Sequence, residues 1–436
     1  MKEKQNEAAQ HVRGVGAGGS AQRACERSSD GPQGAQPPNP YKKGKAPEPY
    51  IKRMKIAEVK LEKFRYRSQM VRDADGHGHP GTEHDAVQSM LTVTTDDGAS
   101  GHYFGGINED VLRTVVTPVL IGEHPLYRER IWYELKERQR LNLSTLPDRV
   151  LTAVDLALWD LAGQITTQPV HKLLGASRDS VPAYASTMVG DDLEGGLNTP
   201  DAYATYALAC KQRGYPAFKL HTWQPPLPGA PSVKRDLLAC AAVRAALGPD
   251  VPLMLDPFHY YSRLEALELA KGLEALNFLW MEEPMDEHSM SSYVWLCEQT
   301  ALPICGPETA EGKMYARAEW IKAGACDMVR AGVGDVGGIT PLVKIAHLAE
   351  AFGMHMEVHG GGVGNLHVLC AMVSPGLYYE RGLLHPFVDY DKPPAWLYES
   401  VDPMDEHGEV HVSQAPGLGM QINFDYIRDN LVTTNS

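Results

Sequence analysis

Ionisable side chains stand at the ends of short apolar segments throughout the second half of the chain. The stretches AFKLH, PLMLD, FLWMEE, PICGPE, MHMEVH and LYYE each run through apolar residues and then reach an ionisable one. The residues concerned are Lys219, His221, Asp256, Glu282, Glu283, Glu308, His359 and Glu380. Because the carboxyl ends of parallel strands meet at one mouth of a barrel, these groups are expected to converge on a single site.

Three of these groups are carboxylates on successive segments, namely Asp256, Glu282 and Glu308. Such a hard-oxygen, trianionic set suits Mg²⁺, which keeps octahedral positions open for water and substrate oxygens. A divalent ion held beside a substrate carboxylate counters the charge that develops when the neighbouring α-proton is removed. The predicted chemistry is therefore Mg²⁺-dependent proton abstraction next to a carboxylate.

The elements that must position these groups follow from the sequence pattern. Across 181–400, apolar segments alternate with helical stretches at intervals of about 25–30 residues, which predicts right-handed βαβ units and a parallel sheet. Eight such strands favour a closed barrel over an open sheet. Residues 54–180 predict an α+β capping domain, with strands at 55–67 and 87–95, a polar loop at 72–85, and helices at 109–120, 126–140 and 147–164. Residues 401–436 are expected to return to the cap.

The first 53 residues differ in composition from the rest. They are rich in Gly, Pro, Gln and Ser and poor in large apolar residues, which predicts a disordered extension. At Met54 the sequence changes to MKIAEVKLEKFRY, which alternates like a strand. We hypothesise that Met54 is the functional start and that residues 1–53 are dispensable.

The overall composition disfavours several classes of function. The 436 residues include 41 basic and 55 acidic ones, giving a formal net charge of −14. This charge disfavours a general attraction to nucleic acid or anionic lipid, and no segment approaches the ~18 apolar residues of a membrane helix. We therefore expect no nucleic acid or membrane partner. The 7 cysteines form no CxxC pair, which favours a reducing, cytoplasmic location over a disulfide scaffold.

As an ordered set, the motifs resemble the mandelate racemase/muconate lactonizing enzyme subgroup of the enolase superfamily. They are AVDLALWDLAGQ and PVHKLLGA, followed by KLH, LMLDP, WMEEP, GPE, GGIT, EVHG and YYE. The resemblance implies a modified (β/α)₇β TIM barrel with an α+β N-terminal capping domain, and a homo-oligomer between dimer and octamer. It places Asp256, Glu282 and Glu308 on the metal ligands. Of the adjacent pair, Glu282 is chosen over Glu283 because side chains alternate along a strand, so that only one of the two points inward. It places Lys219 and His221 on the second-strand base motif, His359 on the catalytic histidine and Glu380 on the glutamate that binds the substrate carboxylate.

Two departures from the family pattern bear on the reaction. His221 stands where the family usually has a second lysine, and Gly332 stands where it usually has the aspartate partner of the histidine. Asp335 and Asp327 are out of register with that position, although Asp335 could reach His359 from the loop. Glu357 alternates with His359 and is a candidate to orient it or to contact substrate; the alternative is a buried group that is satisfied elsewhere.

A histidine without its aspartate suits a general acid better than a strong base. We therefore expect β-elimination of water from an acid sugar, an aldonic or aldaric acid, to a 2-keto-3-deoxy acid. His221 or Lys219 would be the base and His359 the acid. A racemase or epimerase and a sugar-lactone cycloisomerase share the first step and remain alternatives.

Polar residues elsewhere are candidates for substrate binding. Arg330 could bind a second anionic group of the substrate or pair with an inner carboxylate. Arg72 and His79 lie in the polar segment 72–85, which would cover the barrel mouth and suit a polyhydroxylated sugar acid. Two more distant readings are a zinc hydrolase, from the spacing of His77 and His79, and a non-catalytic barrel. The first is disfavoured because these histidines precede the barrel, and the second because binding alone needs no such set of ionisable residues.

Overall fold

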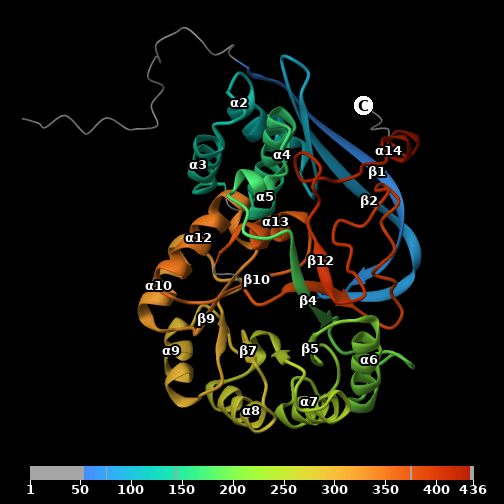
Figure 1. Cartoon of the computed structure of the whole chain (residues 1–436), viewed down its shortest axis with the longest axis vertical. Coiled ribbons are helices and arrows are strands. Elements are labelled where there is room, and N and C mark those ends of the chain that lie inside the picture. Colours follow the sequence, from blue (N-terminus) through green and yellow to red (C-terminus); the bar gives the residue numbers. More distant parts are fainter. Residues whose placement is uncertain (1–53, 75, 143–144, 374–375, 433–436) are drawn as a thin grey trace, which may run out of the picture. The chain divides into compact units, whose positions relative to one another are not determined.

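The computed structural model describes residues 54–74, 76–142, 145–373 and 376–432. The predictions for residues 1–53 lie outside the described residues. An antiparallel sheet comes first in the described chain. From β4 (Ser180–Thr187) onward, strands and helices alternate regularly (Figure 1).

Eight strands form a nearly closed parallel barrel in the order β10-β9-β8-β7-β6-β5-β4-β11, and β12 (Glu409–His411) pairs antiparallel with β4. The barrel strands are β4 (Ser180–Thr187), β5 (Ala217–His221), β6 (Leu253–Asp256), β7 (Trp280–Glu282), β8 (Ile304–Gly306), β9 (Met328–Ala331), β10 (Met356–Val358) and β11 (Tyr379–Leu384). These strands match the eight segments predicted from sequence, and the fold prediction is confirmed.

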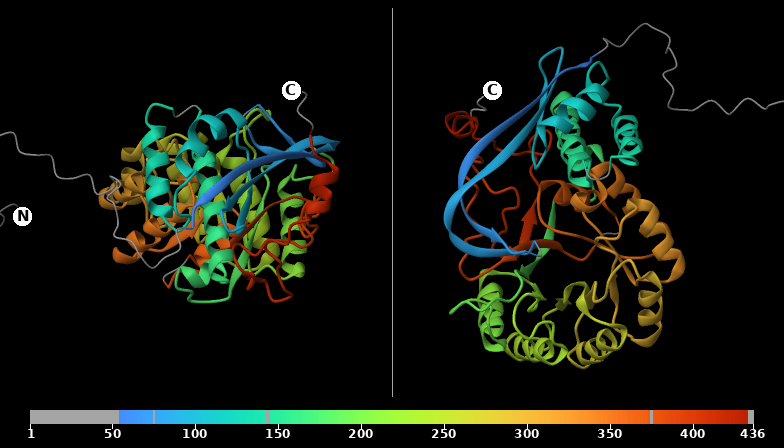
Figure 2. Two further views of the ribbon diagram at one scale, coloured as in Figure 1. Left: turned by 90° about the horizontal axis from the view of Figure 1, so that it is seen from above. Right: turned by 180° about the vertical axis from the view of Figure 1, so that it is seen from behind.

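Helices follow the first seven barrel strands and surround them on the outside (Figures 1 and 2). They are α6 (Pro200–Arg213), α7 (Val233–Leu247), η2 (Phe258–Tyr260), α8 (Arg263–Ala275), α9 (Met290–Gln299), α10 (Lys313–Ala323), α11 (Val333–Val336), α12 (Ile339–Ala351) and α13 (Val363–Ala371). Local sequence fixes several starts: the side chains of Thr199 and Ser232 accept backbone N–H groups, and Ser262 forms a capping box with Glu265.

Strand alternation explains why the ionisable residues share one layer of the barrel. One buried residue from each of six strands forms an inner cluster: Tyr184, Ala217, Met254, Trp280, Cys305 and Met328. Successive side chains on a strand point to opposite faces, so residues two positions further on point inward again. Lys219, Asp256, Glu282 and Arg330 occupy those positions. The apolar cluster is therefore the floor on which the polar layer rests.

The preceding residues form an antiparallel sheet and a group of helices. The sheet contains β1 (Ile56–Arg72), β2 (Gly78–Thr95) and β3 (Ser100–Phe104). The helices are α1 (Glu109–Val111), η1 (Leu112–Val116), α2 (Thr117–Leu120), α3 (Arg128–Gln139), α4 (Asp148–Thr166) and α5 (Val170–Leu173). At the other end of the chain, α14 (Phe424–Asp429) leads into a segment that hydrogen-bonds β1, through Arg65 N to Asn430 O and Val432 N to Lys63 O.

The polar segment 72–85 is not the loop predicted from its composition. Most of it continues the β1–β2 hairpin, with Arg72 paired to Gly78 and Arg67 paired to Asp85. The described side chains in this part of the hairpin are exposed or half-buried and none is fully buried, so it lacks the apolar alternation by which a strand is recognised. The long hairpin curves from the cap across to the barrel (Figures 1 and 2).

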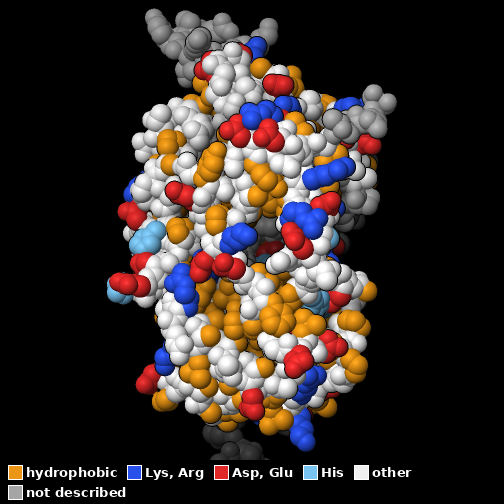
Figure 3. Space-filling model, turned by 90° about the vertical axis from the view of Figure 1, so that its right-hand side faces the viewer, with side chains coloured by type: hydrophobic (Ala, Val, Ile, Leu, Met, Phe, Trp, Pro, Cys, Tyr) orange, Lys and Arg blue, Asp and Glu red, His pale blue; other side chains and the backbone are white. Residues whose placement is uncertain are grey.

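Among the described residues, no helix is both long enough and apolar enough to cross a membrane. On the face shown in Figure 3, hydrophobic side chains gather below a central hollow, and acidic and basic side chains border them.

Candidate active site

The three predicted metal ligands come together at the mouth of the barrel. Asp256 and Glu282 end β6 and β7, and Glu308 follows β8 by two residues. All three are buried, and each offers an oxygen such that these atoms lie within 4.8 Å of one another. The donor set is all oxygen and carries three formal negative charges, which fits a divalent hard cation such as Mg²⁺.

Glu287 fixes the loop that carries Glu308. Its carboxylate accepts the backbone N–H groups of Glu308 and Thr309, each at 2.6 Å, and that of Ala310 at 2.8 Å. The loop therefore holds its conformation through charge-assisted hydrogen bonds, and Glu308 is directed at the other two carboxylates. Sequence reasoning missed Glu287, because a lone acid after a strand–loop transition reads as a solvated charge.

Burial and mutual repulsion disfavour the ionised form of the carboxyl groups at this site. Burial, together with the charges of Glu282 and Asp256, raises the pKa of Glu308 well above its usual range, although His359 and Arg330 oppose the shift. Burial and the charge of Glu308 raise the pKa of Glu283 in the same direction. A cation among these carboxylates relieves both effects, which is the electrostatic signature of a metal site.

Two basic side chains lie among the carboxylates, in the same layer of the barrel. The Lys219 ammonium lies 2.9 Å from Glu380 Oε1, 3.1 Å from Glu282 and 3.6 Å from Asp256 Oδ2. The Arg330 guanidinium lies 2.6 Å from Glu282 Oε1, 2.7 Å from Glu380 Oε2 and 3.3 Å from Glu308 Oε2. Both are fully buried. Of the two roles considered for Arg330, the structure shows the pairing with inner carboxylates, because its donors are already occupied.

Glu380 is held as an ionised carboxylate. It accepts hydrogen bonds from Ser186 Oγ at 2.8 Å and Gly360 N at 2.6 Å, in addition to the contacts with Lys219 and Arg330. Burial opposes ionisation, but the two cations lower the pKa of Glu380 well below its usual range. In this arrangement Glu380 positions the two cations and has no proton to donate to a substrate carboxylate.

His221 lies on β5 beside the first metal ligand. Its Nδ1 is 2.6 Å from the carbonyl oxygen of Thr187, and its Nε2 is 2.9 Å from Asp256 Oδ2. Because a carbonyl only accepts, Nδ1 carries the proton, and Nε2 is the atom that gains or loses one. The ring of Phe258 packs against His221 with centroids 5.3 Å apart.

His359 has an acidic partner: Asp335 does reach it from the loop, so the expectation of a histidine without its aspartate is wrong. Its Nδ1 is 2.8 Å from Asp335 Oδ2, and its Nε2 is 3.0 Å from Glu308 Oε1. Although burial lowers it, the carboxylates of Asp335 and Glu308 raise the pKa of the His359 imidazole to about 10. Asp335 lies three residues after the strand position at which the family usually has this aspartate. The first turn of α11 brings its carboxylate back, where it also accepts Gly332 N at 2.6 Å.

The remaining candidates do not join this group. Glu357 accepts Leu377 N at 2.7 Å, its other oxygen has no hydrogen-bond partner among the described residues, and neither oxygen hydrogen-bonds His359; its predicted substrate contact stays a prediction. Arg72 donates to Gly76 O at 2.7 Å, and His79 lies 2.9 Å from Asp73 Oδ2, so both are engaged within the hairpin tip. Neither contacts a residue of the carboxylate group through the interactions seen in the described residues.

Comparison with known families agrees with this geometry. Residues 202–426 match the family described as enolase C-terminal domain-like, and residues 76–175 match the N-terminal domain of mandelate racemase / muconate lactonizing enzyme. The chain belongs to the enolase superfamily, in the mandelate racemase/muconate lactonizing enzyme group, and the predicted resemblance is confirmed.

Individual relatives include several enzymes of acid sugars. The chain is similar to the crystal structure of D-glucarate dehydratase from Agrobacterium tumefaciens complexed with magnesium. That match has 53% identity and a TM-score of 0.86 and covers 87% of this chain and 100% of the other. L-talarate/galactarate dehydratase of Salmonella typhimurium is 30% identical over 70% of this chain and 71% of its own length. D-galactarolactone cycloisomerase of Agrobacterium fabrum is 28% identical over 71% and 81%, respectively.

Proposed function

We propose that the protein is a Mg²⁺-dependent acid-sugar dehydratase that removes water from an aldaric acid to give a 2-keto-3-deoxy acid. The observation that supports this proposal is the convergence of Asp256, Glu282 and Glu308, with His221 next to Asp256 and His359 next to Glu308. The similarity to D-glucarate dehydratase and to L-talarate/galactarate dehydratase supports a dicarboxylic sugar acid as the substrate class.

Asp256, Glu282 and Glu308 are the residues that would hold Mg²⁺. When bound, Mg²⁺ counters the negative charge that develops on the substrate carboxylate as its α-proton leaves. The magnesium in the D-glucarate dehydratase structure supports this choice of ion. Lys219 and Arg330 are fixed positive charges that orient Glu282 and Glu380 through ion pairs.

The base and the acid stand on opposite walls of the barrel. His221 is on β5 and His359 follows β10, and four strands separate β5 from β10 in the sheet order. His221 takes the α-proton at Nε2, because Nδ1 donates to the carbonyl oxygen of Thr187; to do so, Nε2 must leave its 2.9 Å contact with Asp256 Oδ2. Lys219 makes three ion pairs and is 1% exposed, so it contributes charge and not proton transfer.

His359 delivers the proton that leaves with the β-hydroxyl. Its side chain is 33% exposed at the mouth, so a bound substrate can reach Nε2. Against the effect of burial, the carboxylates of Asp335 and Glu308 raise the pKa of the ring to about 10, which favours the protonated form at neutral pH. The departing group therefore leaves as water and not as hydroxide.

An epimerase or cycloisomerase is the second candidate, and one observation favours it. A histidine backed by an aspartate can also return a proton to the substrate carbon, and the absence of such an aspartate was the sequence argument against these reactions. The similarity to D-galactarolactone cycloisomerase adds weight to this alternative.

The test is an NMR screen in D₂O with Mg²⁺ and a library of aldaric and aldonic acids. We expect a 2-keto-3-deoxy product from an aldaric acid. Deuterium incorporation or an epimer without that product would replace dehydration by the second candidate. If neither exchange nor product appeared with any sugar acid, the proposed substrate class would be wrong.

A further inference from the structure

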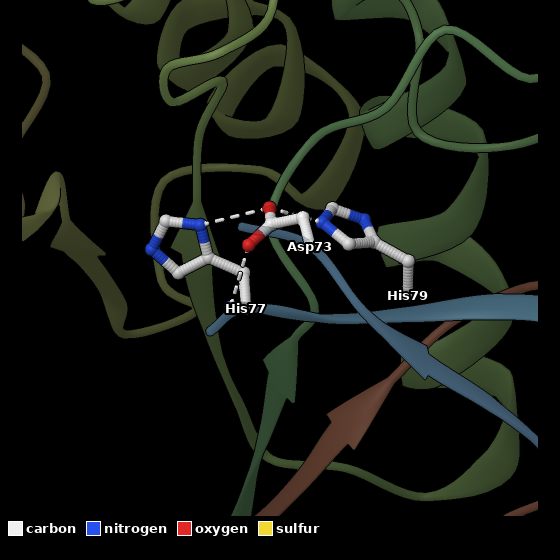
Figure 4. A group of neighbouring side chains, drawn as sticks. All are labelled: Asp73, His77 and His79. Atoms are coloured by element: carbon white, nitrogen blue, oxygen red, sulfur yellow. Dashed lines mark hydrogen bonds and ion pairs between the residues drawn. The ribbon is translucent and has the colours of Figure 1, made fainter. Parts of the chain in front are cut away.

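A second group of metal-binding side chains lies at the tip of the β1–β2 hairpin, outside the carboxylate site. It consists of Asp73, His77 and His79, whose ligand atoms all lie within 4.8 Å of one another (Figure 4). The three side chains are 18%, 10% and 20% exposed, so they are mostly withdrawn from solvent. Two imidazoles and one carboxylate form a ligand set quite different from the all-oxygen group in the barrel.

The two rings converge on one carboxylate oxygen. Asp73 Oδ2 lies 3.2 Å from His77 Nδ1 and 2.9 Å from His79 Nε2. An ion about 2.0–2.2 Å from each of several ligands sets neighbouring ligand atoms about 3–3.5 Å apart. The two N···O separations already lie in or next to that range, and the two histidine nitrogens lie within 4.8 Å of each other. Small side-chain rotations would therefore admit an ion, whose remaining positions would be filled by water.

The backbone holds the ligands in place before any ion binds. Asp73 directly follows β1 and His77 directly precedes β2. Their backbones pair through Asp73 N to His77 O at 3.1 Å, and His77 N donates to Asp73 Oδ1 at 2.9 Å. Arg72 braces the same turn through Gly76 O. This preorganisation lowers the conformational entropy that ion binding would otherwise cost.

We propose that Asp73, His77 and His79 form a second cation site, for a borderline transition-metal ion such as Zn²⁺, Co²⁺ or Ni²⁺. Imidazole nitrogens select these ions over Mg²⁺, whereas the carboxylate group in the barrel has the opposite preference. Binding requires each coordinating nitrogen to be free of its proton, so two N–H···O bonds give way to coordination bonds.

Such an ion would cross-link the two strands of the hairpin where they approach the barrel mouth. The His77 ring packs edge-on against Phe258 with centroids 4.8 Å apart, and Phe258 packs in turn against His221. Ion binding would therefore fix the hairpin tip above the predicted base. The role is one of ordering the cover of the site, and it requires no hydrolytic chemistry.

The test uses Co²⁺ as a spectroscopic probe on the full chain, in saturating Mg²⁺ to occupy the oxygen site. We expect one equivalent of Co²⁺ to bind and to show visible absorption typical of nitrogen ligation. Loss of a ligand in His79→Asn or His77→Asn should weaken binding by more than about 100-fold, since even outer-sphere partners alter metal affinity by about 10–100-fold. Melting temperatures near that of the wild type would show that the variants fold.

A matched control lies on the same hairpin. His84 contacts only Thr82 O in the described structure and lies outside the cluster, so His84→Asn should bind Co²⁺ like the wild type. Glu282→Gln should also retain the nitrogen-type spectrum, because it disturbs only the oxygen site. The proposal is overturned if the wild type shows no nitrogen-type spectrum, or if His79→Asn and His77→Asn keep it. These results are independent of whether the protein is a dehydratase.

Discussion

Replacing Asp335 by Asn tests how the protein keeps an acid at the mouth of the barrel. The substitution keeps the shape of the side chain but removes the negative charge 2.8 Å from His359 Nδ1. A neighbouring opposite charge typically shifts a pKa by about 1–3 units. Because His359 is 33% exposed, solvent screens part of this effect, and we take about 1–2 units, or roughly 1.4–2.7 kcal/mol.

The sign of the effect on activity follows from the role of the imidazole. Dehydration requires protonated His359, so activity falls as the pH rises through its pKa of about 10. In Asp335→Asn that alkaline limb should move down by about 1–2 pH units. The Asn amide oxygen can still accept a hydrogen bond from the ring, but this neutral bond is weaker than the charge-assisted one and orients the ring less firmly, so the rate at neutral pH should fall by about 100-fold, the lower end for general acid catalysis.

The assay is the pH profile of kcat/KM for dehydration, with Asp327→Asn as the matched control. Asp327 also lies beside β9, but it accepts Ile304 N at 2.9 Å and contacts no residue of the site through a described interaction. The control should keep the wild-type limb. The reasoning would be refuted if Asp335→Asn lost activity while the pH at which activity falls on the alkaline side stayed unchanged. Asp335 would then act only through its hydrogen bond with Gly332 N, which is structural.

Three further predictions address the metal site, a buried carboxyl and the N-terminal segment. Glu282→Gln should abolish Mg²⁺-dependent turnover with little change in melting temperature, whereas wild-type turnover would exclude Glu282 as a ligand. Glu357→Gln should stabilise the fold more at pH 8 than at pH 5, by up to about 3 kcal/mol. Burial raises the pKa of Glu357 to about 7 in the folded protein. Ionisation of Glu357 therefore destabilises the fold above pH 7, and it has no such effect below the pKa of the unfolded chain. Equal shifts in melting temperature at both pH values would contradict this reasoning. Deletion of residues 1–53 should leave kcat and melting temperature unchanged, and loss of either would mean that this segment takes part in the fold or the site.

The sequence allowed the barrel and the carboxylate group to be predicted because both depend on short-range patterns. The barrel strands are buried on both faces, so they read as short apolar runs, and the position after each run is fixed by strand geometry. Asp256, Glu282 and Glu308 therefore meet as expected. The same alternation explains why Lys219 and Arg330 rest on the apolar floor formed by Ala217, Met328 and their neighbours.

Features that depend on loop geometry escaped sequence reasoning. Asp335 reaches His359 because α11 begins immediately after β9 and turns back, which residue counting along the strand could not reveal. Glu287 acts on the backbone of another loop, 21 residues away in sequence. The hairpin tip lacks an apolar face, so neither its strand pairing nor the convergence of Asp73 with His77 and His79 has a signal in the periodicity of hydrophobic residues.

The expected homo-oligomer and cytoplasmic location stay predictions, as does the division at residues 180 and 400. Light scattering of the purified chain would determine the oligomeric state directly. A dimer or larger assembly is expected, and a monomer at assay concentration would contradict the expectation.

The measurement that tests the central claim most directly is a comparison of wild type and His359→Asn in D₂O with Mg²⁺ and the aldaric acid identified by the screen. Proton NMR would follow α-deuterium incorporation and the 2-keto-3-deoxy product together. We predict that His359→Asn forms no product and yet exchanges the α-proton, because the proposed base His221 is intact. Loss of both exchange and product would make His359 the base and reverse the assignment of acid and base.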